Sequence, residues 1–278
     1  MYRRSLLGAL LPFAARLQAE EPVIPASLTT LLTEEEEVRL GAKVAANIRK
    51  ESALVPSALV QQYVGQLVQN IASQSQRPAL QYRVAVLDSR QINANATFGG
   101  FIHVYRGLLH FVKDESELAG VLSHEIGHVV GRHSVKSLSR QAQLSSLVKF
   151  AKSTVGLNDA LLSQLADLAV NAVTALPTYH FSREDEMEAD RLAVYQANRA
   201  GYNPDGLLSF LARLSVDGGD PSLLETLLST HPPPASRVEL LRVELREVPR
   251  RVRSAPASSG FAALKSELER LPLPPKSK

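Results

Sequence analysis

Cysteine is absent from the 278 residues of this chain. Without thiols the protein cannot be a disulfide-stabilised domain, hold a metal through thiolates, use a cysteine nucleophile or carry a lipid on an amino-terminal cysteine. Any metal ion must therefore be bound by histidine, aspartate or glutamate. Seven histidines and 28 acidic residues are present in the sequence.

Aromatic residues are also few: they make up 5% of the chain, and tryptophan is absent. The hydrophobic fraction of 45% and the charged fraction of 21% are nevertheless those of an ordinary globular protein. We therefore expect a sizeable core, built mainly from leucine, alanine and valine. Obvious membrane spans are lacking as well. Asp159, Gln164, Asp167 and Asn171 interrupt the apolar stretch at 158–176.

The amino terminus has the pattern of an export signal. A positive start with Arg3 and Arg4 is followed by a mostly apolar stretch at 5–15 and by small residues suited to cleavage. We expect residues 1–19 to be a signal peptide and the mature protein to be periplasmic or otherwise extracytoplasmic. Arg16 and the lack of acidic residues in this segment leave a mitochondrial presequence as the rival interpretation.

The charge balance gives no reason to expect nucleic acid as a partner. The whole chain has a formal net charge of +3. Removing the signal peptide would remove three arginines and leave 28 basic against 28 acidic residues. A mature chain that is neutral overall has no electrostatic footprint for nucleic-acid binding.

The motif His124-Glu125-x-x-His128 carries the most chemical information in the chain. On a helix, residues four apart lie on one face, about 40° from each other, so both imidazoles can reach one ion. Neutral imidazole is a good zinc ligand, and the glutamate beside the first histidine can take a proton from water. Apolar residues on both sides predict a buried helix. Because charged groups in a buried helix are costly without a function, we predict a metal site here.

A catalytic zinc site needs a third protein ligand and an open position. The metzincin pattern would place a third histidine at position 134, but this position is Ser134 and His133 comes one residue too early. On a continuing helix, His133 would point about 180° away from His124. The methionine turn of that pattern is also missing. We therefore exclude the metzincin arrangement.

A better candidate for the third ligand lies on a second helix, predicted to begin after a capping box at Ser182. Glu186 and Asp190 are four residues apart on this helix, among apolar neighbours. Glu186 can supply a carboxylate oxygen to zinc, and Asp190 can accept the outer N–H of a zinc-bound histidine. Glu188 should face away, about 200° around the helix from Glu186. The alternative, a solvated acidic helix start, does not explain these apolar surroundings.

Four motifs follow one another within residues 30–245: Asn95-Ala96-x-x-Gly99-Gly100, Glu117-Leu118-Ala119-x-Val121-Leu122-x-His124-Glu125-x-x-His128, Ser182-Arg183-x-x-Glu186-x-x-Ala189-Asp190, and Thr230-His231-Pro232 with Arg237. In this order they resemble the gluzincin zinc metallopeptidases of the family that includes HtpX, the CAAX prenyl proteases and BepA-like proteases. The resemblance implies Zn²⁺ bound by His124, His128 and Glu186, with Glu125 as the catalytic base. It covers the peptidase domain only, because neither transmembrane spans nor tetratricopeptide repeats are evident.

His231 precedes three prolines, where a rigid surface turn is the ordinary interpretation. The family pattern instead places it at the catalytic site. There it would be a self-inhibiting ligand at the open position of the metal or a donor to the tetrahedral intermediate. We include His231 with Glu125 among the catalytic candidates. Arg237 is expected to be a structural anchor. The other histidines are treated as non-ligands: His103, His110, His133 and His180.

Helices dominate the rest of the predicted structure. They are expected at 33–50, 56–71, 141–156, 158–176, 206–228 and 235–247. The pair at 141–176 could rest on the core or on a membrane surface, so peripheral association with a membrane or an envelope protein is left open. A strand at 82–87 and a hairpin with a two-residue loop at Gly99-Gly100 supply the β-structure. The hairpin edge is either ordinary core or a surface for an extended peptide.

The predicted fold is therefore α+β and mainly α-helical, a zincin-like metallopeptidase domain with a small β-sheet beside the active-site helix. Residues 1–19 are assigned to a signal peptide, 20–248 to the peptidase domain, and 249–278 to a linker and a flexible proline-rich tail.

The predicted function is an exported zinc-dependent metalloendopeptidase with one Zn²⁺ per chain and polypeptide substrates. The resemblance implies misfolded envelope proteins as the substrate class. Two alternatives remain. One is a chaperone-like or adaptor protein with a closed, self-inhibited zinc site, and the other is a mitochondrial member of the same family. The sequence does not indicate an oligomeric state.

Overall fold

The computed structural model describes residues 32–140, 181–217, 234–250 and 258–274, together with the single residues 23, 158, 159, 163, 165, 227 and 231. The predicted signal peptide lies outside the described residues. So do the helices predicted at 141–156 and 158–176, apart from the single residues just given.

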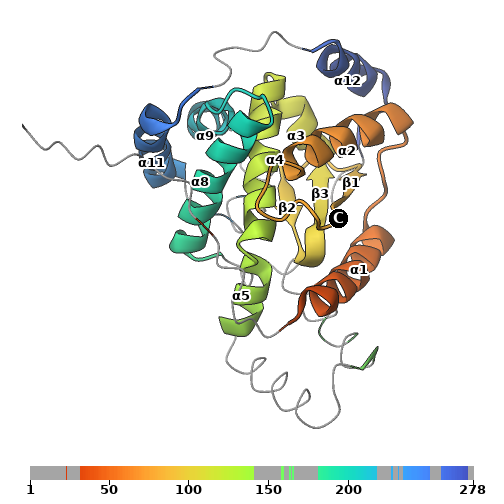
Figure 1. Cartoon of the computed structure of the whole chain (residues 1–278). Helices are drawn as coiled ribbons and strands as arrows, with labels where there is room; N and C mark the ends of the chain where they lie inside the picture. The colour runs from red at the N-terminus through yellow and green to blue at the C-terminus, as the bar shows by residue number, and fades with distance from the viewer. Residues whose placement is uncertain are drawn as a thin grey trace, which may run out of the picture.

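A long central helix, α4 (Glu115–Val130), organises the molecule. A small sheet lies on one side of it, and three helices pack on the other (Figure 1). These three are α8 (Arg183–Arg199), α9 (Gly206–Asp217) and α11 (Pro234–Glu247). The prediction of a mainly helical α+β domain with a small sheet beside the motif-bearing helix is confirmed.

The sheet has three strands in the order β1-β3-β2. The strands are β1 (Arg83–Leu87), β2 (Ala94–Ala96) and β3 (Phe101–Tyr105). The central strand β3 pairs in parallel with β1 and antiparallel with β2. Strand β2 is therefore an edge strand, and it packs against α4.

The connection between β2 and β3 is longer than predicted. Instead of a two-residue Gly99-Gly100 loop, the residues Phe98–Gly100 form a short 3₁₀ turn, and Thr97 donates its N–H to Phe101 O at 2.8 Å. Gly99 has φ 63°, and a Cβ there would lie 2.5 Å from Val38 Cα. Glycine is needed because the turn adopts a left-handed conformation pressed against a helix.

Three further helices lie on the sheet side of α4: α1 (Glu34–Glu51), α2 (Ala58–Ala72) and α3 (Arg106–Phe111). Thr33 and Glu36 form a capping box at the start of α1, and Ser57 caps α2 through the N–H of Val60. The predicted starts of both helices are correct to within two residues.

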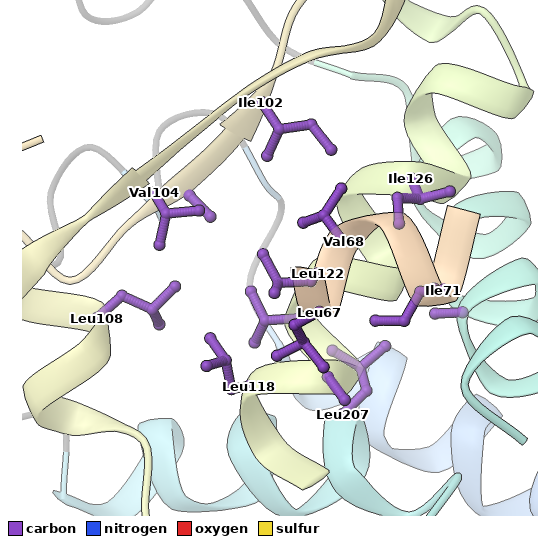
Figure 2. Packing of buried hydrophobic residues seen from close by; sticks show 14 of the residues in the cluster. Leu67, Val68, Ile71, Ile102, Val104, Leu108, Leu118, Leu122, Ile126 and Leu207 are labelled. Atoms are coloured by element: carbon purple, nitrogen blue, oxygen red, sulfur yellow. The ribbon is translucent and has the colours of Figure 1, made fainter. Parts of the chain in front are cut away.

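Buried aliphatic residues from α2, β3, α3, α4 and α9 meet in one cluster (Figure 2). Its labelled members are Leu67, Val68, Ile71, Ile102, Val104, Leu108, Leu118, Leu122, Ile126 and Leu207. Burying a side chain of this kind contributes roughly 1.5–3 kcal/mol. The cluster therefore holds α4 at a fixed position relative to the sheet and α9.

The carboxyl-terminal segment differs from the flexible tail expected over 249–278. Helix α12 (Ser259–Arg270) buries Phe261 and Leu264 against α2 and α3. Its end is fixed by Arg106, whose guanidinium donates to Leu268 O at 3.1 Å and to Pro272 O at 2.7 Å. The expectation of a loose tail is therefore wrong for residues 259–270, which belong to the packed structure.

Within the part of the chain that the structure describes, none of the helices combines the length and apolarity needed to cross a bilayer.

Glu117 joins α4 to α9 and gives a first test of this architecture. Its carboxylate is fully buried and accepts hydrogen bonds from Ser209 Oγ at 2.8 Å and Arg213 Nη2 at 2.6 Å. Burial alone would raise the pKa of Glu117, but these hydrogen bonds, Arg213 foremost, hold it below the ordinary value of 4.5. The carboxylate form therefore stabilises the fold above this pH, and the contribution is lost as the pH falls through the lowered pKa.

We predict that Glu117→Ala lowers the free energy of unfolding by about 3 kcal/mol at neutral pH, because it leaves Arg213 without its buried partner. The difference from the wild type should shrink below pH 4.5. Urea unfolding at several pH values measures both effects, and substitution of the exposed Glu239 on α11 is the control. A difference that stays constant with pH would contradict this role.

Candidate metal centre

Helix α4 presents the first two candidate ligands inside the protein. Asp114 caps the helix, and the residues from Glu117 to Val130 are buried. The Nε2 atoms of His124 and His128 are 2.9 Å apart, and the two rings lie edge to face. This is the arrangement predicted from the four-residue spacing.

Glu186 on α8 faces both imidazoles. Its Oε1 is 3.4 Å from His128 Nε2, and its Oε2 is 3.6 Å from His124 Nε2. Ligand atoms about 2.0–2.1 Å from one tetrahedral zinc ion lie about 3.3 Å from one another. The spacings between these atoms therefore suit a single shared ion.

His231 completes a group of four side chains. Its Nδ1 is 2.8 Å from Glu186 Oε1 and 3.4 Å from His124 Nε2. Four buried residues, here called the metal-ligand cluster, each offer one possible ligand atom, and these atoms all lie within 4.8 Å of one another: His124, His128, Glu186 and His231. The rigid surface turn considered for His231 is therefore excluded, because its imidazole lies inside the protein beside the other candidate ligands.

The close crossing of α4 and α8 sets these distances. Gly127 lies between the two histidines of α4, and Ala189 lies between Glu186 and Asp190 on α8. A Cβ on Gly127 would lie 2.9 Å from Ala189 O and 3.0 Å from Ala189 Cα. The two backbones can approach this closely only because position 127 has no side chain.

Asp190 and Arg237 contact the candidate ligands His124 and Glu186. Asp190 Oδ1 lies 2.9 Å from His124 Nδ1, the outer nitrogen of that ring, as the sequence predicted. Arg237 donates to both oxygens of Asp190, at 2.8 and 2.6 Å, and its Nη1 is 2.9 Å from Glu186 Oε2. Burial alone would raise the pKa of Asp190, but Arg237 and His124 lower it. Asp190 is therefore a carboxylate that can accept the outer proton of His124.

Glu125 points from α4 toward the edge strand of the sheet. Its Oε2 accepts the N–H of Ala96 at 2.7 Å, and its Oε1 is 3.9 Å from His231 Nε2. Burial raises the pKa of the Glu125 carboxyl. A carboxylate with a raised pKa beside a metal-ligand cluster is suited to proton transfer. At Ala96, the strand edge considered as a peptide-binding surface is already used to hold this carboxylate.

His133 does not lie where a continuing helix would place it. His133 lies under the metal-ligand cluster, with its Nδ1 2.8 Å from His128 Nδ1. Glu188 is 3.2 Å from the other nitrogen of the His133 ring. The expectation that His133 points away from His124 is wrong, because α4 ends at Val130 and the chain turns at Arg132, which has φ 52°. Glu188, on α8, is not part of the group formed by His124, His128, Glu186 and His231.

The other histidines lie apart from this group. His103 on β3 is buried, its Nδ1 is 3.2 Å from Asn95 Oδ1, and burial lowers its pKa to about 4. His110 is exposed on α3. His180 lies outside the described residues.

A mainly apolar cavity opens beside the metal-ligand cluster. Leu207, Phe210, Leu211 and Leu214 line it from α9, and His124, Glu125, His231 and Arg237 border it on the cluster side. Val121 and Leu227 complete the wall. An apolar side chain that entered this space would lie next to Glu125.

Comparison with known proteins gives a consistent result. The model of Peptidase family M48 matches residues 58–245. The Beta-barrel assembly-enhancing protease of Yersinia pestis is 28% identical over 225 residues, which are 78% of this chain and 45% of that protein. Mitochondrial metalloendopeptidase OMA1 of Schizosaccharomyces pombe is 29% identical over 185 residues, 66% of this chain and 53% of that protein. Metalloprotease YcaL of Escherichia coli is 33% identical over 153 residues, 54% of this chain and 57% of that protein. The chain thus spans about half the length of these curated relatives.

Proposed function

The chain belongs to peptidase family M48, and from that premise we propose that it is an exported zinc-dependent metalloendopeptidase with one Zn²⁺ per chain. The observation that carries the proposal is the convergence of His124, His128 and Glu186 from two helices, with Glu125 beside them. Two imidazoles and one carboxylate are a known protein ligand set for catalytic zinc. The absence of cysteine leaves no thiolate alternative.

A Zn²⁺ ion held by these three side chains would supply a Lewis acid for the scissile carbonyl and lower the pKa of a coordinated water. The side chains of the protein provide the rest. Glu125 accepts the proton of the attacking water and delivers it to the leaving amine, a transfer that its raised pKa favours. Ala96 holds the Glu125 carboxylate in place through its N–H. Asp190 and Arg237 keep His124 oriented.

His231 is proposed to occupy the fourth coordination position of the ion, the fourth corner of the site, in the resting protein. The position of its Nδ1, near both Glu186 and His124, supports a ligand role over a donor role. A substrate carbonyl would need that corner, so His231 must move before catalysis. The site would then be a protease held in a self-inhibited form.

Polypeptides are the proposed substrates, and envelope proteins the proposed class. The leucine-lined cavity next to Glu125 supports recognition of an apolar side chain near the cleaved bond. The name of the Yersinia relative refers to the assembly of β-barrels. Peripheral association with a membrane or an envelope protein remains part of this proposal.

The proposed location follows from the export signal and is tested by fractionation. A carboxyl-terminally tagged full-length chain should be recovered from the periplasm or the envelope, shortened by its first 19 residues. Recovery of the unprocessed chain from the cytoplasm, or of a processed chain from mitochondria, would reject the proposed location.

Glu125→Gln tests the assignment of the base. We expect casein cleavage to fall by about 10²–10⁴-fold, because a proton-transfer group is lost, while one zinc per chain is retained. Glu186→Ala is the contrasting variant and should lose the metal itself. Zinc content by atomic spectroscopy is measured beside the cleavage rate. Wild-type cleavage by a zinc-loaded Glu125→Gln protein would end the mechanism.

His231→Ala tests closure of the fourth corner. Turnover should rise about tenfold if closure holds the competent form about 1.4 kcal/mol above the resting form. Zinc should remain bound through His124, His128 and Glu186. The measurement is the rate of casein cleavage per bound zinc. A slower variant with full zinc content would instead indicate that His231 donates to the reacting substrate.

A further inference from the structure

The two histidines of the motif are supported by different kinds of partner. A histidine that binds a metal through Nε2 carries its proton on Nδ1, and this N–H needs an acceptor. For His124 the acceptor is the Asp190 carboxylate, 2.9 Å away. For His128 the neighbouring atom is the Nδ1 of another imidazole, that of His133, at 2.8 Å.

The proton positions in this second pair follow from the remaining contacts. Two facing ring nitrogens can share only one proton between them. The Nε2 of His133 is 3.2 Å from Glu188 Oε2, so a proton on Nε2 finds a carboxylate acceptor. The Nδ1 of His133 is then unprotonated and accepts the Nδ1–H of His128. His128 thus donates to His133, and His133 donates to Glu188.

From this geometry we propose that His133 is a positioning residue for the metal, which fixes the tautomer and ring orientation of His128, and that Glu188 in turn fixes His133. The proposal rests on the proposed zinc site. The affinity for the metal would then depend on His133 and Glu188, which do not touch the ion, as well as on the three ligands.

The surroundings of the His128 ring support this role. Phe181 stacks on it, with ring centroids 4.0 Å apart and planes 22° apart. Stacking restrains the tilt of the ring but does not decide which nitrogen faces the metal. The hydrogen bond to His133 makes that choice, because only one ring orientation presents Nδ1 to His133 and Nε2 to Glu186.

A second metal site is the competing interpretation of these residues. His133, Asp185 and Glu188 could place one ligand atom each within 4.8 Å of one another. Their polar atoms, however, already have partners in the protein. Glu188 pairs with Lys136 Nζ at 3.2 Å, and Asp185 caps α8 through the N–H of Ser182 at 3.0 Å. A cation would compete with the lysine ammonium, so the cluster is better explained as support for His128.

Gly131 provides a way to disturb His133 without changing any polar group. Its backbone has φ −72°, which alanine adopts readily, but a Cβ there would lie 2.2 Å from His133 Nε2. Gly131→Ala must therefore displace the imidazole. Gly65→Ala in α2 is the matched control, because a Cβ at position 65 meets no atom within 4 Å.

The experiment measures the zinc dissociation constant of the full chain by competition with a chelator, independently of proteolysis. We expect His133→Phe and Gly131→Ala to weaken zinc binding by about 10–100-fold, the range for partners that orient metal ligands. His133→Asn, whose amide oxygen can take the place of Nδ1, should recover part of the affinity. His103→Phe, a buried histidine outside the cluster, and Gly65→Ala should leave zinc binding unchanged.

A spectroscopic readout separates positioning from a general loss of stability. In the zinc-loaded protein, ¹⁵N spectra of the imidazoles should show His128 protonated on Nδ1 and His133 protonated on Nε2. Glu188→Met, at a partly exposed position, removes the acceptor at His133 Nε2 and should weaken zinc binding, while His128 stays protonated on Nδ1. The opposite tautomers in the wild type would overturn the proposal.

The possible failures are distinguishable. Wild-type protein that binds no zinc would overturn the zinc site and this inference together. Wild-type zinc affinity in folded His133→Phe and Gly131→Ala, with thermal unfolding verified for each, would overturn only the role of His133. If neither variant folds, wild-type zinc affinity in Glu188→Met would overturn it equally.

Discussion

The backbone contact between α4 and α8 is the constraint on which the rest of the site depends. Gly127 of α4 meets Ala189 of α8 so closely that an added Cβ would lie 2.9 Å from a carbonyl oxygen. Because helical side chains four residues apart share a face, this one contact places a pair of histidines opposite a pair of acids. Ligands held by two packed helices are pre-positioned more accurately than ligands on loops. The crossing of two helices therefore defines the site, and the sheet supports it through Ala96.

Burying several charged groups at this crossing is unfavourable unless they neutralise one another. Glu186 and Asp190 share Arg237, whose guanidinium contacts both carboxylates. Burial alone would raise the pKa of Glu186, but His231 and His128 hold it well below its ordinary value. At Glu125 the effect of burial outweighs the opposing effects of His231 and His124, and its pKa is raised instead. The same buried pocket thus keeps one carboxylate ionised as a candidate ligand and keeps another ready to exchange a proton.

The sequence was sufficient for the parts of the site that depend on helical periodicity, and insufficient where the helix ends. The four-residue spacings predict that His124 and His128 share one face of α4 and that Glu186 and Asp190 share one face of α8, and the structure has both pairs in this arrangement. His133 differs from the expectation because the helix does not continue: α4 ends at Val130 and the chain turns at Arg132, which has φ 52°. Arg132 is held there by Glu37 Oε2 at 2.9 Å, a contact between residues 95 positions apart. Helix α12 was not predicted. Its apolar residues have helical spacing, but prolines flank the segment, and the helices that it packs against, α2 and α3, are distant in the sequence.

The fourth member of the metal-ligand cluster differs from the other three in how it is held. His124, His128 and Glu186 lie within α4 and α8, whereas His231 precedes α11 and is joined to Leu227 by a backbone hydrogen bond of 2.9 Å. Both His231 and Leu227 also line the apolar cavity beside Glu125. A displacement of His231 that keeps this hydrogen bond must therefore move Leu227 with it. If His231 closes the fourth position as proposed, opening that position and reshaping the cavity would be two results of one movement, and the backbone would couple access to the ion with access for an apolar side chain.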